Sequence, residues 1–431
     1  MPLQPPFSEG RTLRRMTTHL KKNPSDRTVR VIRLLLLAGI VSALAAPVPQ
    51  ASANSPAQTT LTAAAGTAEA LFGTSVSIEG NTAVVGAPDE GSMGAAYVFT
   101  RRAGTWVEQA TLVLPVRTEG ERFGHDVAIS GDTIVVGAPK ADQTKPITVP
   151  GVAYVFVRTS HGWSHQATLS PSDSKTDDAF GFGVAISGDT IMIGANAGTV
   201  LPSAESGAAY VFTRVGKAWN EQAKLTPAGG APDDNFGFSV ALSGDTAVVG
   251  MPRGDVGGVV GQGSARVFTR RGSVWTEQAT LTVADALPGD WVGASTSISG
   301  DTVVIGASGK TIGSNPSQGS AYVFTREGEA WTQKAKLTAP DGTAGDMFGH
   351  SVAATGEQVA VGAHFDDGGS VYVFSRDSAW ETPTKLRAEG AGLFGVSLWM
   401  SGHTVVSGAN FTTVEGRANQ GAAYVFDLRK A

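Results

Sequence analysis

One unit of sequence returns seven times along the chain, and this recurrence constrains the fold more than any other feature. Residues 236–282 show it in full: a Phe-Gly step, then four short apolar runs separated by turn residues. A turn glycine marks each copy at intervals of 46 to 57 residues, at Gly80, Gly131, Gly188, Gly244, Gly300, Gly356 and Gly402. Four apolar runs predict four strands, and seven such units predict an all-β, seven-bladed β-propeller of four-stranded antiparallel blades.

Within one unit the pattern predicts four strands, here named A to D in chain order. Large and small residues alternate from Phe236 to Leu242, which predicts strand A, and the apolar run 247–249 predicts a buried strand B. Between them Ser243-Gly244-Asp245-Thr246 predicts a two-residue hairpin turn. Residues 95–100 predict strand C of the first unit, and Trp106 opens its strand D.

The last unit stops after strand C, at Phe426. Its missing strand D is found at the other end of the protein, because residues 58–62 match residues 278–282 of the fourth unit. We therefore expect the N-terminal strand to complete the last blade, which closes the ring and removes open sheet edges.

The first 53 residues differ in kind from the repeats. Arg27, Arg30 and Arg33 precede an apolar run of 13 residues, 34–46, and Ala51-Ser52-Ala53 follows it. This pattern predicts a secretory signal peptide over residues 1–53 with cleavage after Ala53, and a mature propeller over residues 54–431. The basic leader is long, so Met16 is an alternative start. The predicted location is outside the cell or in the cell envelope.

The net charge and the absence of cysteine limit the classes of partner and of metal site that this chain can have. Residues 1–53 carry eight basic and two acidic residues, so the remaining chain has a net charge of −11, against −5 for the whole sequence. An acidic surface disfavours nucleic acid and favours cations or basic proteins. The absence of cysteine excludes disulfides and thiolate metal sites. The mature sequence predicts no transmembrane segment, and we expect a monomer.

Two short motifs recur in every copy with small changes. Phe72-Gly73 stands with Gly86-Ala87-Pro88, and Phe123-Gly124 with Gly137-Ala138-Pro139. Together they resemble the FG-GAP repeat of the integrin α-chain propeller and of many bacterial secreted proteins, over residues 58–428. Single copies depart from it: Val292-Gly293 replaces Phe-Gly, and Gly-Ala-Asn replaces Gly-Ala-Pro at residues 194–196 and 408–410. The resemblance implies a seven-bladed propeller with ligands on one face.

Many members of that family carry an Asp-rich calcium loop between strands A and B. This chain has only a two-residue turn there, which cannot supply the six to eight oxygen ligands of calcium. We therefore predict no cofactor and interpret the calcium sites of the A–B loops as lost. The recurring turn aspartates fit ordinary turn chemistry; they are Asp132, Asp189, Asp245 and Asp301.

Binding is expected on the face that carries the B–C and D–A loops, since the B–C loops vary in length while the A–B turns do not. Drift of surface loops is the alternative. Acidic residues gather in the D–A loops and suggest a weak cation site or a surface for a basic partner, the alternative being turn capping. They are Asp177, Asp178, Asp233, Asp234, Asp285, Asp290, Asp341 and Asp346.

Two further features invite a ligand interpretation. Arg253-Gly254-Asp255, in a B–C loop, spells the tripeptide that integrins recognise, although a glycine-rich chain also produces it as an ordinary turn. Tryptophans at the start of strand D suggest either sugar binding or packing at the outer end of a blade. They are Trp106, Trp163, Trp219, Trp275, Trp331 and Trp380.

The sequence lacks the Gly-x-Ser-x-Gly and His-Glu-x-x-His motifs. It therefore favours a non-enzymatic, secreted binding or adhesion module that presents variable loops to a protein or glycan. The alternatives are a lectin-like glycan binder, a propeller hydrolase or lyase, and a purely structural protein of the cell envelope.

Overall fold

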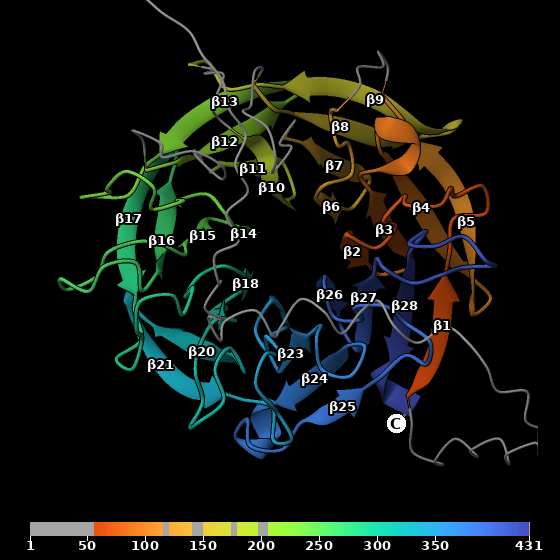
Figure 1. Cartoon of the computed structure of the whole chain (residues 1–431). Helices are drawn as coiled ribbons and strands as arrows, with labels where there is room; N and C mark the ends of the chain where they lie inside the picture. The colour runs from red at the N-terminus through yellow and green to blue at the C-terminus, as the bar shows by residue number, and fades with distance from the viewer. Residues whose placement is uncertain (1–55, 115–119, 140–149, 174–178, 197–205, 431) are drawn as a thin grey trace, which may run out of the picture. The chain divides into compact units, whose positions relative to one another are not determined.

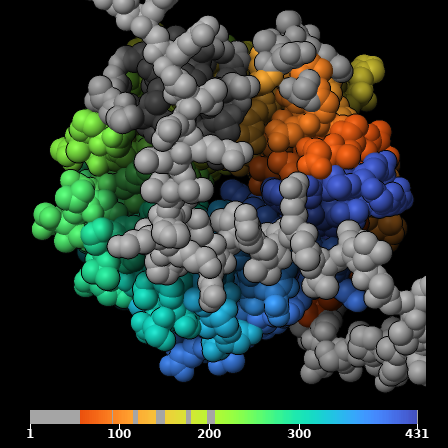
Figure 2. Space-filling view, viewed as in Figure 1, coloured from red at the N-terminus to blue at the C-terminus, as the bar shows by residue number. Residues whose placement is uncertain are grey.

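Seven four-stranded antiparallel sheets stand around a central axis, as the repeats predict (Figure 1). The structure is a computed structural model that describes residues 56–114, 120–139, 150–173, 179–196 and 206–430. The predicted signal peptide, residues 1–53, lies outside the described residues. The colours of Figure 2 follow the ring in chain order, so that the first and last blades adjoin. Blades 1 to 7 are numbered by their A strands in chain order.

The A and B strands form the inner half of every blade. The A strands are β2 (Ser75–Glu79), β6 (Val127–Ser130), β10 (Phe180–Ser187), β14 (Val240–Ser243), β18 (Thr296–Ser299), β22 (Ser351–Ala354) and β26 (Leu398–Ser401). The B strands are β3 (Thr82–Ala87), β7 (Thr133–Ala138), β11 (Thr190–Ala195), β15 (Thr246–Met251), β19 (Thr302–Ala307), β23 (Gln358–Ala363) and β27 (Thr404–Ala409). The B strands are buried almost throughout, as expected of strands covered on both faces.

The C and D strands form the outer half. The C strands are β4 (Ala95–Arg102), β8 (Val152–Thr159), β12 (Ala208–Val215), β16 (Ser264–Arg271), β20 (Ser320–Glu327), β24 (Ser370–Ser375) and β28 (Ala422–Asp427). The D strands are β5 (Thr105–Leu112), β9 (Gly162–Leu169), β13 (Ala218–Leu225), β17 (Val274–Leu281), β21 (Ala330–Leu337), β25 (Thr384–Leu386) and β1 (Ala57–Leu61). The described helices are three short 3₁₀ turns, η1 (Glu90–Ser92), η2 (Arg376–Ser378) and η3 (Leu428–Lys430).

The first strand of the chain completes the last blade, as predicted. Strand β1 pairs antiparallel with β28, from Ala57 opposite Asp427 to Leu61 opposite Ala423. In Figure 1 the red-orange β1 lies beside the blue β28. Leu61 is 2% exposed and packs between blades 7 and 1. The closure therefore rests on an apolar contact as well as on the strand ladder.

Strand A begins later than the alternation of the sequence predicts in every blade except blade 3, where β10 starts at Phe180. In blade 4 the strand starts at Val240 rather than at Phe236. The residues before it form a tight turn, in which the Phe238 amide donates to the Asn235 carbonyl at 3.2 Å and Gly237 has a φ of +88°. These are the features of a type II turn, whose third position requires a positive φ and so favours glycine. The Phe-Gly step is thus a turn, and the Phe236 side chain packs between two blades.

The glycine of the Gly-Ala-Pro motif allows adjacent blades to approach closely. A Cβ added to Gly86 of blade 1 would lie 2.0 Å from the carbonyl oxygen of Gly124, the glycine of the Phe-Gly step in blade 2. Gly137 meets Gly181 in the same way, at 2.1 Å. The two motifs of the repeat therefore face each other across every such seam, and neither glycine tolerates a side chain.

An arginine near the end of strand C joins neighbouring blades on the A–B turn face. Arg214 forms an ion pair with Asp189 of its own A–B turn, and its Nη1 donates to Thr133 Oγ1 of the preceding blade at 3.0 Å. Its guanidinium also lies 5.1 Å from the centre of the Trp219 ring. The same set surrounds Arg158, Arg270 and Arg326. The recurring turn aspartates thus hold these arginines in addition to shaping the turn.

The strand D tryptophans are structural contacts between blades. Trp219 Nε1 donates to Gln166 Oε1 of the preceding blade at 2.9 Å, and Trp331 Nε1 donates to Gln278 Oε1 at 3.0 Å. One ring face of each lies under an arginine. This arrangement agrees with the packing interpretation, because one face and the indole N–H group of Trp219 and of Trp331 are already engaged.

Candidate functional site

The B–C and D–A loops share one face, because both connect strand ends on the same side of each antiparallel blade. Backbone hydrogen bonds fix the two loop types to each other. The Val292 amide donates to the Gln262 carbonyl, and the Phe348 amide donates to the Gln318 carbonyl at 2.9 Å. The Gln318 side chain is 4% exposed and donates to the Ala339 carbonyl. These loops are therefore held in place and offer a defined surface.

Exposed apolar side chains concentrate on this loop face. Of the ten large hydrophobic residues that are exposed in the described part of the chain, seven lie in B–C or D–A segments. They are Val113, Val259, Val260, Leu287, Trp291, Phe365 and Phe411. Trp291 is 42% exposed, Phe365 52% and Phe411 46%. Single exposed apolar residues are ordinary, whereas seven of the ten lie in the loops of this one face.

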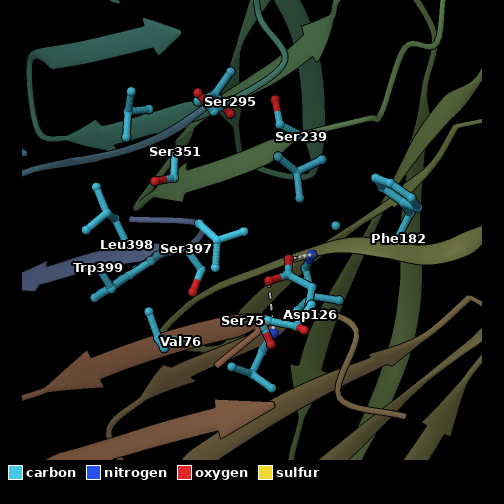
Figure 3. Close-up of a pocket in the computed structure, with 18 of the residues that line it drawn as sticks. Ser75, Val76, Asp126, Phe182, Ser239, Ser295, Ser351, Ser397, Leu398 and Trp399 are labelled. Carbon is cyan, nitrogen blue, oxygen red and sulfur yellow. Dashed lines mark hydrogen bonds between the residues drawn. The ribbon is translucent and has the colours of Figure 1, made fainter. Parts of the chain in front are cut away.

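A cavity of about 250 Å³ lies at the centre of the ring (Figure 3). Every blade contributes to its wall with the residues that follow its Phe-Gly step or its equivalent. Trp399, where other blades carry serine or alanine, also lines it. This volume is at the small end for ligand sites and suits a single side chain better than a drug-sized molecule.

A ring of serines borders the cavity and ties each blade to the next. Ser75 Oγ donates to the Gly124 carbonyl at 3.0 Å, across the seam between blades 1 and 2. The same bond is formed by Ser239, Ser295, Ser351 and Ser397. Two blades depart from the pattern, because Asp126 stands at this position in blade 2 and Gly183 in blade 3. The break places a carboxylate in the cavity wall beside an empty side-chain position.

An aromatic row lies next to this break. The His125 and Phe182 rings are 4.6 Å apart, and the Phe182 and Phe238 rings are 4.9 Å apart, so three successive blades contribute one continuous row. Burial lowers the pKa of His125 to about 4, which keeps the ring neutral at neutral pH. In blade 6, His350, His364 and Phe365 form a second row with ring distances of 4.0 and 4.1 Å.

Asp126 is held by backbone groups alone. Its Oδ2 accepts the Val184 amide at 2.7 Å and its Oδ1 accepts the Val127 amide at 3.0 Å. The residues that line the cavity include no lysine or arginine. Burial raises the pKa of the Asp126 carboxyl to about 7, although these two hydrogen bonds act in the opposite direction.

This pKa predicts that Asp126 destabilises the folded chain as pH rises. A carboxyl whose pKa is about 3.9 unfolded and about 7 folded weakens stability progressively across that window, because the unfolded chain loses its proton first. Asp126→Ser restores the residue of five other blades. We expect the free energy of unfolding of this variant, relative to the parent, to rise by on the order of 1 kcal/mol from pH 4.5 to pH 8. Urea unfolding at both pH values measures this gain.

The matched control for that measurement is Asp255→Ser, which removes an exposed carboxylate outside the cavity. Its stability relative to the parent should change little between the two pH values. Since His125 and His350 also line the cavity, His125→Phe in the Asp126→Ser background tests whether histidine contributes. Equal gains for Asp126→Ser at pH 4.5 and pH 8 would contradict the assignment.

The tripeptide Arg253-Gly254-Asp255 lies at the start of the blade 4 B–C loop. Both charged side chains are exposed, while Gly254 is buried and a Cβ there would lie 2.2 Å from the Met251 side chain. Asp255 Oδ1 accepts the Gly261 amide at 2.8 Å, so this carboxylate holds the loop hairpin. Whether it also binds a partner stays a prediction.

The D–A aspartates do not gather at a single point, although Asp285 and Asp290 both pair with Lys310. Asp234, Asp290 and Asp346 are buried, and the Oδ2 atom of each accepts the amide three residues earlier, which closes the loop. Burial raises the pKa of Asp234. Asp233 is half-buried with a φ of +65°. Asp177 and Asp178 lie outside the described residues.

The remaining D–A aspartates contact strand C and D side chains. Asp341 accepts hydrogen bonds from Lys385 Nζ at 2.6 Å and from Tyr372 Oη at 2.7 Å, and these bonds lower its pKa. Asp285 meets Lys336 and Tyr322 in the same way. Within the described residues, no cluster of three histidine or acidic residues is placed to hold a metal ion.

Comparison with known families decides the relationship. Six segments match the family model described as FG-GAP repeat, at residues 57–99, 106–156, 163–212, 219–268, 275–324 and 331–374. The chain belongs to the FG-GAP repeat family. A search of the curated proteins found no match. Each matched FG-GAP segment starts in strand D of one blade and ends in strand C of the next. One repeat of the sequence therefore spans parts of two neighbouring blades, which is why the first strand of the chain belongs to the last blade.

The sequence analysis of this FG-GAP propeller did not predict the residues that line the central cavity. The signal was present in the third residue after the phenylalanine of each Phe-Gly step, which is serine in most copies and Asp126 or Gly183 in two. No helix in the described part of the chain combines the length and apolar character needed to cross a bilayer.

Proposed function

We propose that this FG-GAP propeller is a non-enzymatic binding module that presents its B–C and D–A loops to another protein outside the cell. The observation that carries the proposal is the group of exposed aromatic side chains on that face, Trp291, Phe365 and Phe411, on loops fixed by backbone hydrogen bonds. Buried aromatic anchors dominate the energy of protein interfaces. The predicted signal peptide supports a location outside the cell or in its envelope.

A binding role is favoured over catalysis because the acidic residues of this face close their own loops or pair with lysines. Asp234, Asp290 and Asp346 each cap their own loop. A hydrolase or lyase would need carboxylates or histidines convergent on a substrate. A glycan is the second candidate ligand, because exposed aromatic faces such as that of Trp291 also stack on sugars.

The test compares two triple substitutions on opposite faces. We expect Trp291→Asn, Phe365→Ser and Phe411→Ser together to weaken capture of partners from surface extracts at least about tenfold, since a few aromatic anchors supply most interface energy. Asparagine is chosen at 291 because that residue has a φ of +58°. Capture followed by quantitative mass spectrometry, then affinity measurement with the purified partner, provides the readout.

The control variant carries Val107→Ser, Val215→Ser and Val274→Ser, which lie in strand D or beside C–D turns and are 52%, 69% and 63% exposed. It removes comparable exposed apolar surface away from the loop face and should capture partners as the parent does. Equal loss in both variants would refute the proposal. Binding of the parent to a glycan array, abolished by the loop-face variant, would instead support the glycan alternative.

A further inference from the structure

The third residue of strand C is a tyrosine in most blades, and three of these tyrosines are accompanied by a lysine and a carboxylate. In blade 6, Lys385 of strand D stands opposite Tyr372, and its Nζ lies 4.9 Å from the centre of the tyrosine ring. Lys385 pairs with Asp366 of the B–C loop at 2.7 Å, and Tyr372 Oη donates to the same carboxylate at 2.6 Å. Blades 3 and 5 form the same group with a carboxylate of the preceding D–A loop; the residues are Tyr210, Lys224 and Asp173 in blade 3 and Tyr322, Lys336 and Asp285 in blade 5.

Blade 4 brings a cation to the same place by another route. Its strand C carries Arg266 where the other blades carry tyrosine, and Thr280 of strand D stands opposite. Arg266 Nη1 donates to Thr280 Oγ1 at 2.7 Å and to Glu277 Oε1 at 2.9 Å. Blades 3 to 6 therefore each supply a basic side chain of their own to this position.

Blade 1 keeps the tyrosine and the acidic groups but lacks the basic residue. Thr111 stands opposite Tyr97, at the position that Lys385 has in blade 6. Tyr97 Oη donates to Glu90 Oε2 at 3.3 Å, and Thr111 Oγ1 donates to Glu108 Oε1 at 3.3 Å. Burial and the negative charges of these two glutamates raise the pKa of Tyr97, so its hydroxyl stays protonated.

The two glutamates of blade 1 have backbone groups as their further partners. Glu90 Oε2 accepts the Thr67 amide at 3.2 Å, and Glu108 Oε2 accepts the Ala64 amide at 3.0 Å. Among the described residues, no lysine or arginine forms an ion pair with either glutamate. Blade 1 thus holds two carboxylates where blades 3 to 6 hold carboxylates that are neutralised.

A cavity of about 230 Å³ occupies the place of the missing lysine. Its polar wall is formed by Glu90, Tyr97 and Thr111, and no basic residue lines it. Its apolar wall includes Met93, Val113 and Leu114. A carboxylate beside apolar side chains suits a ligand that has a charged end and an aliphatic stem. The volume is below that of drug-sized ligand sites and suits a small group.

The other two blades with threonine at this position differ around the tyrosine. In blade 2, where Thr168 stands opposite Tyr154, the His165 ring lies 5.9 Å from the tyrosine ring. In blade 7 the hydroxyl of Tyr424 is associated with Thr412. Blade 1 is therefore the place where the threonine, a carboxylate on the tyrosine and an open cavity occur together.

We propose that this pocket of blade 1 binds a primary alkylammonium group, which is an ammonium carried on a short aliphatic stem. The ammonium pairs with Glu90 and lies over the Tyr97 ring, as Lys385 does with Asp366 and Tyr372 in blade 6. A free aliphatic amine and a lysine side chain of a polypeptide share this chemistry. The site is separate from the exposed aromatic residues of the loop face and does not depend on the function proposed above.

Other ligands fit the pocket less well. Calcium takes six to eight oxygen ligands, whereas one carboxylate lines this wall. A neutral ligand would leave the charges of Glu90 and Glu108 unpaired. The three blades with a tyrosine and a paired carboxylate all use lysine, which makes an ammonium the best match to the space in blade 1.

The test titrates residues 54–431 with three probes by calorimetry at low salt. The probes are n-butylamine, which is the side chain of lysine without its backbone, acetyl-Gly-Lys-Gly-amide, and n-butanol, which has a similar size and no charge. We expect at least one of the two ammonium probes to bind at least about tenfold more tightly than n-butanol. Tighter binding of n-butylamine indicates a free amine as the ligand, and equal or tighter binding of the peptide indicates a lysine side chain.

Three variants connect this binding to the pocket. Glu90→Gln keeps an acceptor for the Thr67 amide but removes the charge, and it should weaken binding of the ammonium probes at least about fivefold. Thr111→Lys gives blade 1 the strand D residue of blades 3, 5 and 6, so its own ammonium should fill the pocket and abolish binding without lowering the melting temperature. Glu381→Gln changes the net charge as Glu90→Gln does, at an exposed residue between β24 and β25, and should bind the probes as the parent does. Circular dichroism confirms that each variant is folded.

Four results would overturn the proposal. These are absence of binding by both ammonium probes at millimolar concentration, equal binding of n-butanol, an equal loss in Glu381→Gln, and binding that survives in folded Thr111→Lys. The loop-face substitutions at 291, 365 and 411 leave this pocket intact. A failed titration with capture that depends on those substitutions refutes the blade 1 site alone, whereas amine binding with capture that ignores them refutes the proposed function alone.

Discussion

Deleting residues 54–65 is expected to lower the melting temperature of the propeller by about 10 °C or more. The deletion removes β1, and with it the five-residue ladder to β28 and the buried Leu61 and Ala63 side chains. Burial of one leucine stabilises by roughly 2 kcal/mol, and each ladder hydrogen bond adds about 1 kcal/mol. The open edge of β28 would also favour association. Differential scanning calorimetry and size-exclusion chromatography, with residues 54–431 as reference, measure both effects.

Single substitutions on β1 distinguish the contribution of the buried Leu61 side chain from that of the hydrogen bonds between β1 and β28. Leu61→Asp places a charge at a residue that is 2% exposed and should reproduce much of the loss. Thr60→Asp changes an exposed neighbour on the same strand and should have little effect. A melting curve that the deletion leaves unchanged would show that blade 7 does not need β1.

Gly349→Ala is expected to destabilise the fold by about 3 to 5 kcal/mol, although it adds a single methyl group. Gly349 is the glycine of the Phe-Gly step in blade 6, with a φ of +92°, and an added Cβ would lie 2.2 Å from the Ser320 carbonyl oxygen. The left-handed conformation alone costs an alanine about 1 kcal/mol. The remainder comes from the clash, because the obstructing atom belongs to the backbone of the neighbouring blade.

The same blade offers a matched control in Gly356→Ala. Gly356 lies in the A–B turn without a positive φ, and an added Cβ there has no atom within 4 Å. Its stability should stay within about 0.5 kcal/mol of the parent. Urea unfolding of the two variants compares the same chemical change in a crowded and in an open position. Similar losses at both positions would mean that the Phe-Gly turn is not the tight contact described here.

The propeller could be predicted from sequence because its evidence is repeated seven times. Strand periodicity, the turn glycines and the match of residues 58–62 to strand D gave the blade number and the ring closure. The start of strand A was wrong because alternation at Phe236–Phe238 imitates a strand where a type II turn stands. The role of Asp189 as an arginine partner needed the structure, since its partner Arg214 lies on another strand and also donates to Thr133 of the preceding blade.

The candidate site was predicted only in outline. The loop face was expected from loop variability, but Asp234 and Asp346, which the sequence offered as ligands, close their own loops in the structure. The cavity residues escaped notice because they differ from the repeat at one position in two copies. Only the ring geometry places Asp126, Phe182 and Phe238 at one wall. The departures Asp126 and Gly183 can be interpreted together only when the structure shows that their two blades are in contact.

The pairing of β1 with β28 also sets the order in which the molecule can be completed. Residue 57 is among the first of the propeller to be synthesised, and its partner Asp427 is among the last. Blades 1 to 6 are contiguous in sequence, so each can form soon after its own four strands exist. Blade 7 must wait for nearly the whole chain, and a contact of such long sequence separation forms slowly. Until then the ring remains open, and the nascent protein exposes the sheet edge that its first strand will finally cover.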